Sequence, residues 1–126
     1  MQQEEIESYL SEAKDCVCQG KRHIEMNANR QDNIDLFTNY IIDEAKADEI
    51  ILGLTAMDFS EIRQNDHAGY EHEQIYIFGK DVILLERYGT EEKVVPLYIK
   101  FNKLENQYLI VISFHEQKSP LTYYFK

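Results

Sequence analysis

Three side chains able to move protons or stabilise charge lie in the last third of the chain: Tyr98, Lys100 and His115. Histidine titrates near neutral pH and can both give and take a proton. A lysine ammonium supplies positive charge, and a phenol can donate a hydrogen bond. Each residue type is also common on a solvated strand, where it has no special role. Whether the three form a site depends on the element that carries them.

Residues 97–125 predict that element. LYIKF alternates apolar and polar side chains, a polar break follows, and LIVISFHE is mostly apolar, which is typical of a β-hairpin followed by a C-terminal strand. A turn centred on Glu105-Asn106 would give one apolar layer, and a slip of one residue would mix it with polar side chains. The opposed pairs in this register are Phe101 with Ile110, Ile99 with Ile112, and Leu97 with Phe114.

The polar side chains occupy the other face in the same register. Tyr98 would pair with Ser113 and Lys100 with Val111. His115 would lie diagonally from Tyr98, about 7 Å away. We therefore expect a phenol, an ammonium and an imidazole on one half-open surface, none of them needed for the core.

Amphipathic patterns predict helices ahead of the sheet. The stretch 2–17 has apolar residues at helical spacing with acids and lysine between them. A second helix would be capped by Asp32 or Asn33, and a third by Asp43. Residues 55–58, TAMD, fit a capping pattern that opens one more short turn.

Two polar segments, 21–30 and 61–74, are predicted to be loops. The second contains His67 and His72 among several carboxylates, and this donor set suits zinc. The spacing matches no metal-binding motif, so we expect no metal and no cofactor.

Residues 75–88, IYIFGKDVILLERY, alternate as a strand does. Gly79 indicates a bulge or bend, which would turn Lys80 out of the sheet. The chain thus places helices first and an antiparallel sheet after them. That order predicts the α+β class, with N-terminal helices packed on one face of the sheet.

A chain of 126 residues is expected to form a single domain, 1–126, whose core needs no disulfide or metal. Cys16 and Cys18 would project about 200° apart on the first helix and stay reduced. No apolar run approaches the roughly 20 residues of a membrane span. The acidic N-terminus lacks the features of a signal peptide, so we expect a cytoplasmic protein with no membrane partner.

The formal net charge of −10 is unevenly distributed. Residues 1–63 carry 14 acidic and 6 basic side chains, whereas residues 64–126 carry 9 and 7. This balance argues against non-specific nucleic-acid binding through a broad positive surface. It still permits a locally basic face on the sheet.

Three blocks, taken in order, resemble the MqsR family of toxins from bacterial type II toxin–antitoxin pairs: EIILGLTAMDF, IFGK, and LYIKF with LIVISFHE after the hairpin. The similarity covers residues 29–126, a toxin-like core, and leaves residues 1–20 as an additional N-terminal helix. It implies a RelE-like α+β fold and metal-independent endoribonuclease cleavage of single-stranded messenger RNA. It also implies a cognate antitoxin as protein partner.

The resemblance also implies site residues. Tyr98 and Lys100 match the family's Tyr-Ile/Leu-Lys strand, His115 follows Ser-Phe where members have Lys or His, and Lys80 matches Phe-Gly-Lys. Metal-free RNA cleavage needs a base for the ribose 2′-hydroxyl, a cation for the phosphorane and an acid for the 5′-oxygen. These four residues are the expected catalytic set. The chain differs at Ser60-Glu61, where some members place a catalytic lysine.

The acidic composition supports a different function on the same fold. A catalytically silent interaction domain could use its acidic helices to bind a basic or nucleic-acid-binding protein. General hydrolase chemistry has little support, because the chain has no GxSxG motif.

Overall fold

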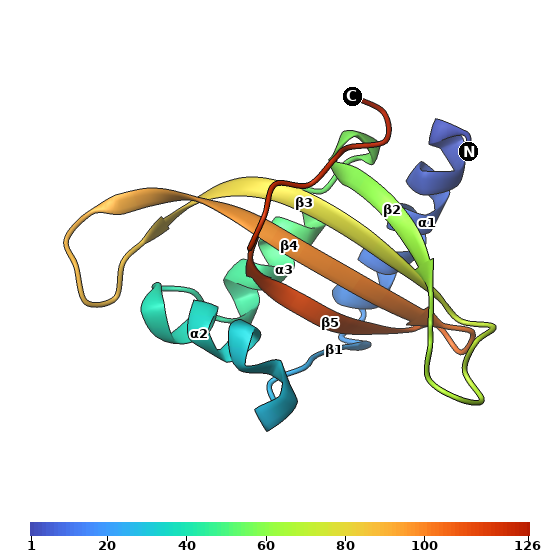
Figure 1. The fold of residues 1–126 in the computed structure, drawn as a ribbon, viewed down its shortest axis with the longest axis horizontal. Helices are drawn as coiled ribbons and strands as arrows, with labels where there is room; N and C mark the ends of the chain where they lie inside the picture. Colours follow the sequence, from blue (N-terminus) through green and yellow to red (C-terminus); the bar gives the residue numbers. More distant parts are fainter.

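The expected α+β class is confirmed by the computed structural model, which describes residues 1–126 (Figure 1). No helix is both long and apolar enough to span a membrane. The helices are α1 (Gln3–Cys18), α2 (Gln31–Asn39) and α3 (Glu44–Leu52), with 3-10 turns at Ala28–Arg30 and Ala56–Asp58. The strands are β1 (Arg22–Ile24), β2 (Phe59–Gln64), β3 (Gln74–Leu85), β4 (Glu92–Leu104) and β5 (Tyr108–Glu116).

The strands form one sheet in the order β1-β5-β4-β3-β2. Strand β1 runs parallel to β5, and every other neighbouring pair is antiparallel. The expectation of a purely antiparallel sheet is therefore wrong at one edge. Strand β1 lies inside the segment 21–30, which is predicted to be a loop, because three residues are too few to show an alternating pattern.

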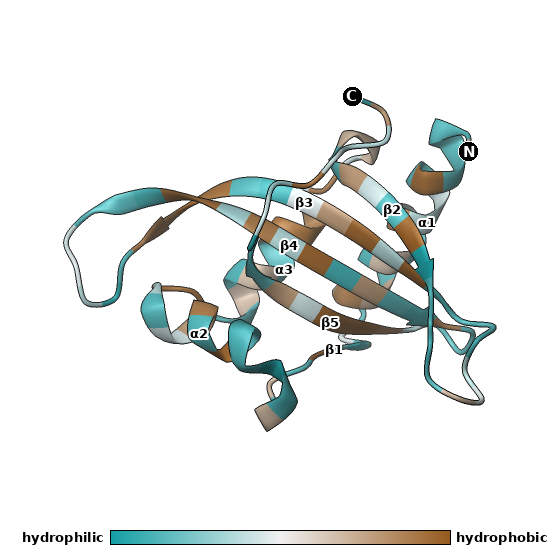
Figure 2. Ribbon diagram, viewed as in Figure 1, coloured by the Kyte–Doolittle hydropathy of each residue, from teal (hydrophilic) through white to brown (hydrophobic).

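Helices α1 and α3 lie behind the sheet in the view of Figure 1, whereas α2 lies beside the edge formed by β5. The core fills the space between the helices and the sheet. Six residues of α1 are buried at the spacing predicted for an amphipathic helix. They join apolar side chains from one face of β3, β4 and β5 in a single cluster. Figure 2 shows the resulting division of α1 and α2 into apolar and polar sides.

Two of the predicted caps are confirmed. The Asp43 side chain accepts a hydrogen bond from the backbone N–H of Lys46 at the start of α3. Thr55 and Asp58 form a capping box around the second 3-10 turn. The prediction for α2 is wrong, because this helix continues directly from the turn at Ala28–Arg30 and has no side-chain cap.

The segment 61–74 was expected to be a loop, but its first residues belong to β2. Phe59 and Ile62 face the core, while Glu61 and Arg63 lie on the other face. A register shift between Phe59 and Glu61 interrupts the alternation. Because of that irregularity, apolar and polar residues do not alternate regularly along β2 in the sequence.

The predicted register of the β4–β5 hairpin is also wrong. The turn uses three residues, Glu105 to Gln107, and Gln107 adopts a left-handed conformation with φ of 62°. Phe101 therefore faces Val111 instead of Ile110. Leu109 and Val111 are fully buried, whereas Ile110 is half-buried on the opposite face.

Beyond this point a β-bulge changes which side chains of β5 point into the core. The pairing passes from Phe101–Val111 to Lys100–Ser113, which leaves Ile112 as an extra residue. Phe114 can then point into the core, where it is fully buried. The bulge is the reason that both halves of β5 contribute to one core.

The side-chain amide of Asn33 in α2 fills the gap in hydrogen bonding that the bulge creates. Its Nδ2 donates to the carbonyl oxygens of Ile112 (3.0 Å) and Glu25 (2.9 Å). Its Oδ1 accepts from the N–H of Phe114 (2.8 Å). Asn33 is only 1% exposed, so water cannot replace these bonds.

The segment after β5 was expected to be a strand, but residues 117–126 form no regular element. They cross the sheet toward β2 (Figure 1), where Ser60 Oγ donates to the carbonyl of Thr122 (2.6 Å). Gly79 makes the crossing possible, because a Cβ there would lie 2.5 Å from the Tyr123 hydroxyl oxygen. Strand β3 pairs with β4 through Gly79 without a bulge, contrary to expectation.

Replacing Asn33 by alanine should lower the free energy of unfolding by about 3 kcal/mol, because three buried backbone groups lose their partner. Urea unfolding followed by circular dichroism measures this change. Asn39→Ala is a matched control at an exposed site of the same helix and should change stability by less than about 0.5 kcal/mol. Equal losses in both variants would contradict the role given to Asn33.

Candidate functional site

Tyr98 and His115 lie directly opposite each other on β4 and β5, closer than the diagonal arrangement expected. Their rings are stacked, with centroids 5.2 Å apart and planes 15° from parallel. Lys100 is the next residue of β4 on this face and pairs with Ser113. By ordinary strand geometry Lys100 is therefore about 7 Å from His115 on the diagonal. The structure thus brings together three of the four expected site residues.

The face that carries these residues is the one opposite α1 and α3 (Figure 1). We call it the open face. Along β4 it presents Tyr98, Lys100 and Asn102, because their neighbours Leu97, Ile99 and Phe101 point into the core. The three buried residues anchor the strand, and this fixes the direction of the polar ones.

One nitrogen of His115 has a defined partner. Nδ1 lies 2.8 Å from the carbonyl oxygen of Glu116, and a carbonyl oxygen can only accept. The proton of the neutral ring must therefore be on Nδ1, which leaves the lone pair on Nε2 free to take a proton. A cavity of about 160 Å³ opens beside this ring and is lined only by polar residues, among them Arg30 and Ser113.

Lys100 has an unusual electrostatic environment. Burial lowers its pKa below the ordinary value for lysine, and the positive charges of Arg30 and Arg63 lower it further. Asp66 acts in the opposite direction. A lysine held in this way releases its proton more readily than an exposed one.

The pKa of Tyr98 is shifted in the opposite direction. Burial raises its pKa above the ordinary value, with Arg63 opposing and Glu61 adding to the rise. The phenol therefore keeps its proton at neutral pH and acts as a hydrogen-bond donor.

Arg30 and Arg63 are the site residues that the sequence did not indicate. Arg63 is on the open face of β2, the strand expected to be a loop, and it is paired with Glu61. Arg30 ends the 3-10 turn before α2, 70 residues from Lys100 in the chain. Only a correct prediction of β2 and of its place in the sheet would have brought Arg63 near Lys100.

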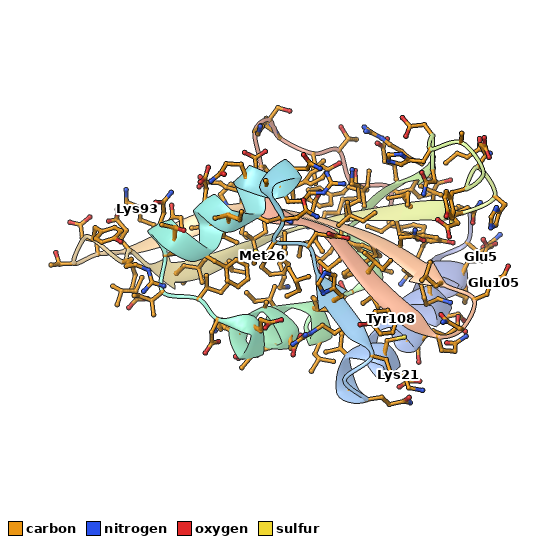
Figure 3. All side chains as sticks on the ribbon, turned by 90° about the horizontal axis from the view of Figure 1, so that it is seen from below. Glu5, Lys21, Met26, Lys93, Glu105 and Tyr108 are labelled. Atoms are coloured by element: carbon orange, nitrogen blue, oxygen red, sulfur yellow. The ribbon has the colours of Figure 1, made fainter.

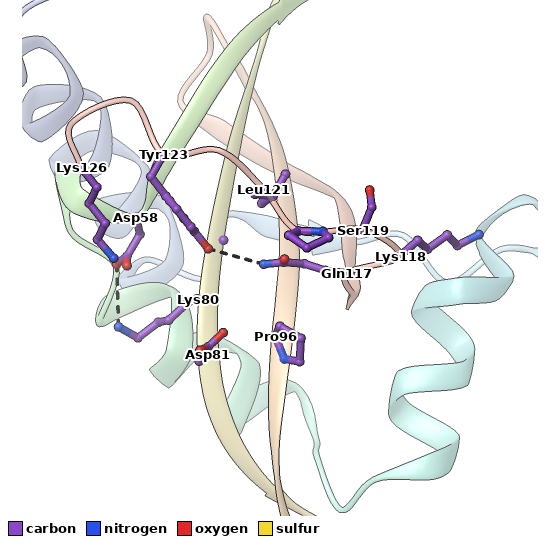
Figure 4. Close-up of a pocket in the computed structure, with 12 residues that line it drawn as sticks. Asp58, Lys80, Asp81, Pro96, Gln117, Lys118, Ser119, Leu121, Tyr123 and Lys126 are labelled. Carbon is purple, nitrogen blue, oxygen red and sulfur yellow. Dashed lines mark hydrogen bonds and ion pairs between the residues drawn. The ribbon is translucent and has the colours of Figure 1, made fainter.

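Lys80 is not in this cluster. It pairs with Leu97 of β4, so its side chain leaves the sheet on the face opposite to Tyr98. Its Nζ lies 3.7 Å from a carboxylate oxygen of Asp58. Figure 4 shows the two side chains pointing toward each other at one end of a pocket of about 570 Å³ between β3 and the C-terminal segment.

The metal hypothesis for the β2–β3 loop has no support in the structure. No three or more His, Cys, Asp and Glu side chains gather so that they could hold a metal ion. His67 and His72 are both exposed. Cys16 and Cys18 are free thiols, with Cys16 buried.

No family model, no curated protein and no solved structure matches this chain. The resemblance to MqsR toxins therefore stands on the quoted sequence blocks alone.

Arg63→Ala should raise the pKa of Lys100, because a positive neighbour that disfavours the ammonium is removed. An NMR titration of the Lys100 side-chain carbons measures this change. Lys46→Ala removes a positive charge from the outer side of α3 and should leave the Lys100 titration unchanged. A Lys100 pKa that does not move in Arg63→Ala would contradict the proposed coupling.

Proposed function

We propose that the protein is a metal-independent endoribonuclease that cuts single-stranded messenger RNA on the open face of its sheet. The observation that carries the proposal is the stack of Tyr98 and His115 beside Lys100, whose pKa is lowered by burial and by two arginines. An imidazole, a phenol and clustered cations are the groups that RNA transesterification requires. The resemblance to MqsR toxins points to the same chemistry.

Each step can be assigned to a residue. His115 Nε2 takes the proton of the ribose 2′-hydroxyl, which then attacks the adjacent phosphorus. Lys100 and the two arginines stabilise the charged phosphorane, and Lys100 gives its proton to the departing 5′-oxygen. The products are a 2′,3′-cyclic phosphate and a 5′-hydroxyl. Tyr98, which stays protonated, donates a hydrogen bond to a phosphate oxygen.

The charge distribution supports a substrate that is guided to one face. Five carboxylates on the outer side of α1 are exposed and repel the RNA backbone: Glu4, Glu5, Glu7, Glu12 and Asp15. The cations Arg30, Arg63 and Lys100 gather on the open face. We propose a cytoplasmic toxin of this kind, neutralised by a cognate antitoxin.

The exposed acids of α1 also favour a second candidate, an interaction domain without catalytic activity that binds a basic or nucleic-acid-binding protein. Glu61 points the same way, because its carboxylate pairs with Arg63 beside Tyr98 and offsets part of the positive charge. The two candidates differ in one measurable property, the cleavage of RNA.

His115→Ala should lower the cleavage rate by about 10²–10⁴-fold, because the base for the 2′-hydroxyl is lost. Tyr98→Phe keeps the stacked ring and should lose about tenfold, since only a hydrogen bond to the phosphate is removed. Gel analysis of a defined messenger RNA, incubated in chelator, gives the rates and shows whether the fragments end in cyclic phosphate.

His23→Ala is the matched control for the histidine variant, because His23 is exposed on β1, next to Ile110 and five residues of β5 away from His115. It should cleave at the wild-type rate. RNA left intact by the folded wild-type protein would reject the ribonuclease and leave the interaction domain.

Two lysine variants distinguish between two versions of the active site. The resemblance implies a site that includes Lys80, whereas the structure places Lys80 outside it. Lys100→Ala should weaken RNA binding and lower the rate at least tenfold, whereas Lys80→Ala should keep both near wild type. Filter binding with an uncleavable 2′-deoxy oligonucleotide measures affinity apart from chemistry. A strong defect in Lys80→Ala, with folding confirmed, would return Lys80 to the active site.

A further inference from the structure

The longest part of the sheet extends beyond its neighbours as a two-stranded arm, residues 81–95. Strand β5 ends opposite Leu97 and β2 ends opposite Phe78, so only β3 and β4 continue. Figure 1 shows the arm projecting to the left of the rest of the molecule, and Figure 3 places Lys93 near its tip.

The exposed apolar side chains of the protein concentrate on this arm. Nine large apolar residues of the chain are exposed, and four of them lie here: Ile83 (60%), Leu85 (43%), Tyr88 (84%) and Val94 (65%). Ile83 and Val94 are directly paired across the strands, on the face turned away from the helices. Figure 2 shows these apolar segments on the arm. An apolar cross-strand pair with this exposure has no role in the core.

The outer edge of β4 on the arm is free. At the base of the arm the N–H of Gln117 donates to the carbonyl of Pro96 (2.7 Å), so the backbone of Pro96 points away from β3. Backbone groups alternate in direction along a strand, so those of Val94 and Glu92 point the same way. No strand lies beyond them. Four backbone groups, two N–H and two C=O, are therefore available to a further strand.

The opposite edge of the arm is covered. The N–H of Ile41 donates to the carbonyl of Leu85 (2.8 Å), and Tyr40 forms a β-bridge with Glu86. One edge is therefore closed by the protein's own chain while the other is left open. A lysine or a proline usually blocks an open edge. The open edge carries one of each, but Lys93 is paired with Glu86 and Pro96 lies at the base of the arm.

The charge of the arm selects the kind of chain that could pair with this edge. Its two basic residues are already engaged: Arg87 donates to carbonyls at the end of α2, and Lys93 pairs with Glu86 (3.4 Å). Asp81, Glu91 and Glu92 are exposed and have no ion pair. On the open face of the arm, the apolar pair of Ile83 and Val94 therefore lies between the carboxylates of Asp81 and Glu92.

We propose that the free edge of β4 on the arm binds an extended segment of a partner protein in which a lysine or arginine stands two positions before and two positions after an apolar residue. The segment pairs with the backbone of Glu92 and Val94 and covers Ile83 and Val94 with its apolar side chain. Its basic side chains lie on the same face as the apolar one, two residues away on either side, next to Asp81 and Glu92. A second copy of this chain is a poor occupant, because its own arm would bring the same carboxylates to the interface. The proposal does not depend on ribonuclease activity.

The test uses a phage-displayed library of random twelve-residue peptides, selected on the full-length protein and counter-selected on Val94→Pro. Proline removes the outward N–H at an edge position that tolerates it. We expect enriched peptides in which basic residues stand two positions on either side of an apolar residue. A synthetic peptide of that sequence should bind wild type about tenfold more tightly than Val94→Pro. Val94→Thr retains the N–H and the branched side chain, and should lose less than about threefold.

Two further readouts locate the binding. The amides of Glu92 and Val94 should exchange rapidly with solvent in the free protein and become protected by the peptide, while Glu92→Lys should weaken binding of the basic peptide. RNA cleavage by Val94→Pro should match wild type.

Selection that yields no peptide dependent on Val94, or peptides without a basic bias, would overturn the proposal. So would slow exchange of the Glu92 and Val94 amides in the free protein. Sedimentation that shows a dimer disrupted by Val94→Pro would overturn it in favour of a second copy.

Discussion

The three hydrogen bonds of the Asn33 amide are the constraint on which the rest of the structure depends. A β-strand turns every second side chain to the same face, so β5 could bury either Leu109 and Val111 or Phe114, but not both sets. The bulge at Ile112 removes that conflict at the cost of unpaired backbone groups. Asn33 satisfies those groups from inside the core and joins α2 to β5. The same bulge determines that His115, one residue beyond Phe114, points to the open face.

This dependence explains which parts of the fold the sequence predicted. Helix α1 follows from its apolar spacing, and α3 and the turn at Ala56–Asp58 follow from caps that need only neighbouring residues. The hairpin register depends on a three-residue turn and a bulge, and neither has a local signal once Gln107 takes the left-handed position that glycine usually fills. The alternation still predicted correctly that Tyr98, Lys100 and His115 lie on one face. That prediction requires only the polar side of each strand to be known, and not the register between the strands. The prediction for Lys80 was wrong. Gly79 does not mark a bulge, and its missing side chain instead leaves room for the C-terminal segment that crosses the sheet.

The arginines show a second limit of the sequence. Arg30 and Arg63 affect Lys100 through space, from a turn and an edge strand that are far from it in the chain. A net charge of −10 averages over such positions and hides a local excess of cations. The distribution has a physical consequence, because repulsion from the acidic outer side of α1 and attraction at the open face act on the same polyanion. Overall acidity and a site for a negatively charged ligand are therefore compatible in one small protein.

The pairing of β1 with β5 joins the beginning of the chain to its end. The N–H of Glu25 donates to the carbonyl of Val111, and the Cys16 thiol donates to the carbonyl of Gln107, 91 residues away. Contacts between such distant positions slow folding, since a long stretch of chain must be ordered before they form. During synthesis the apolar side of α1 has no complete sheet to cover it until β5 has emerged. The molecule therefore folds late and as a whole, and its dependence on chaperones should be greatest just before its last strand leaves the ribosome.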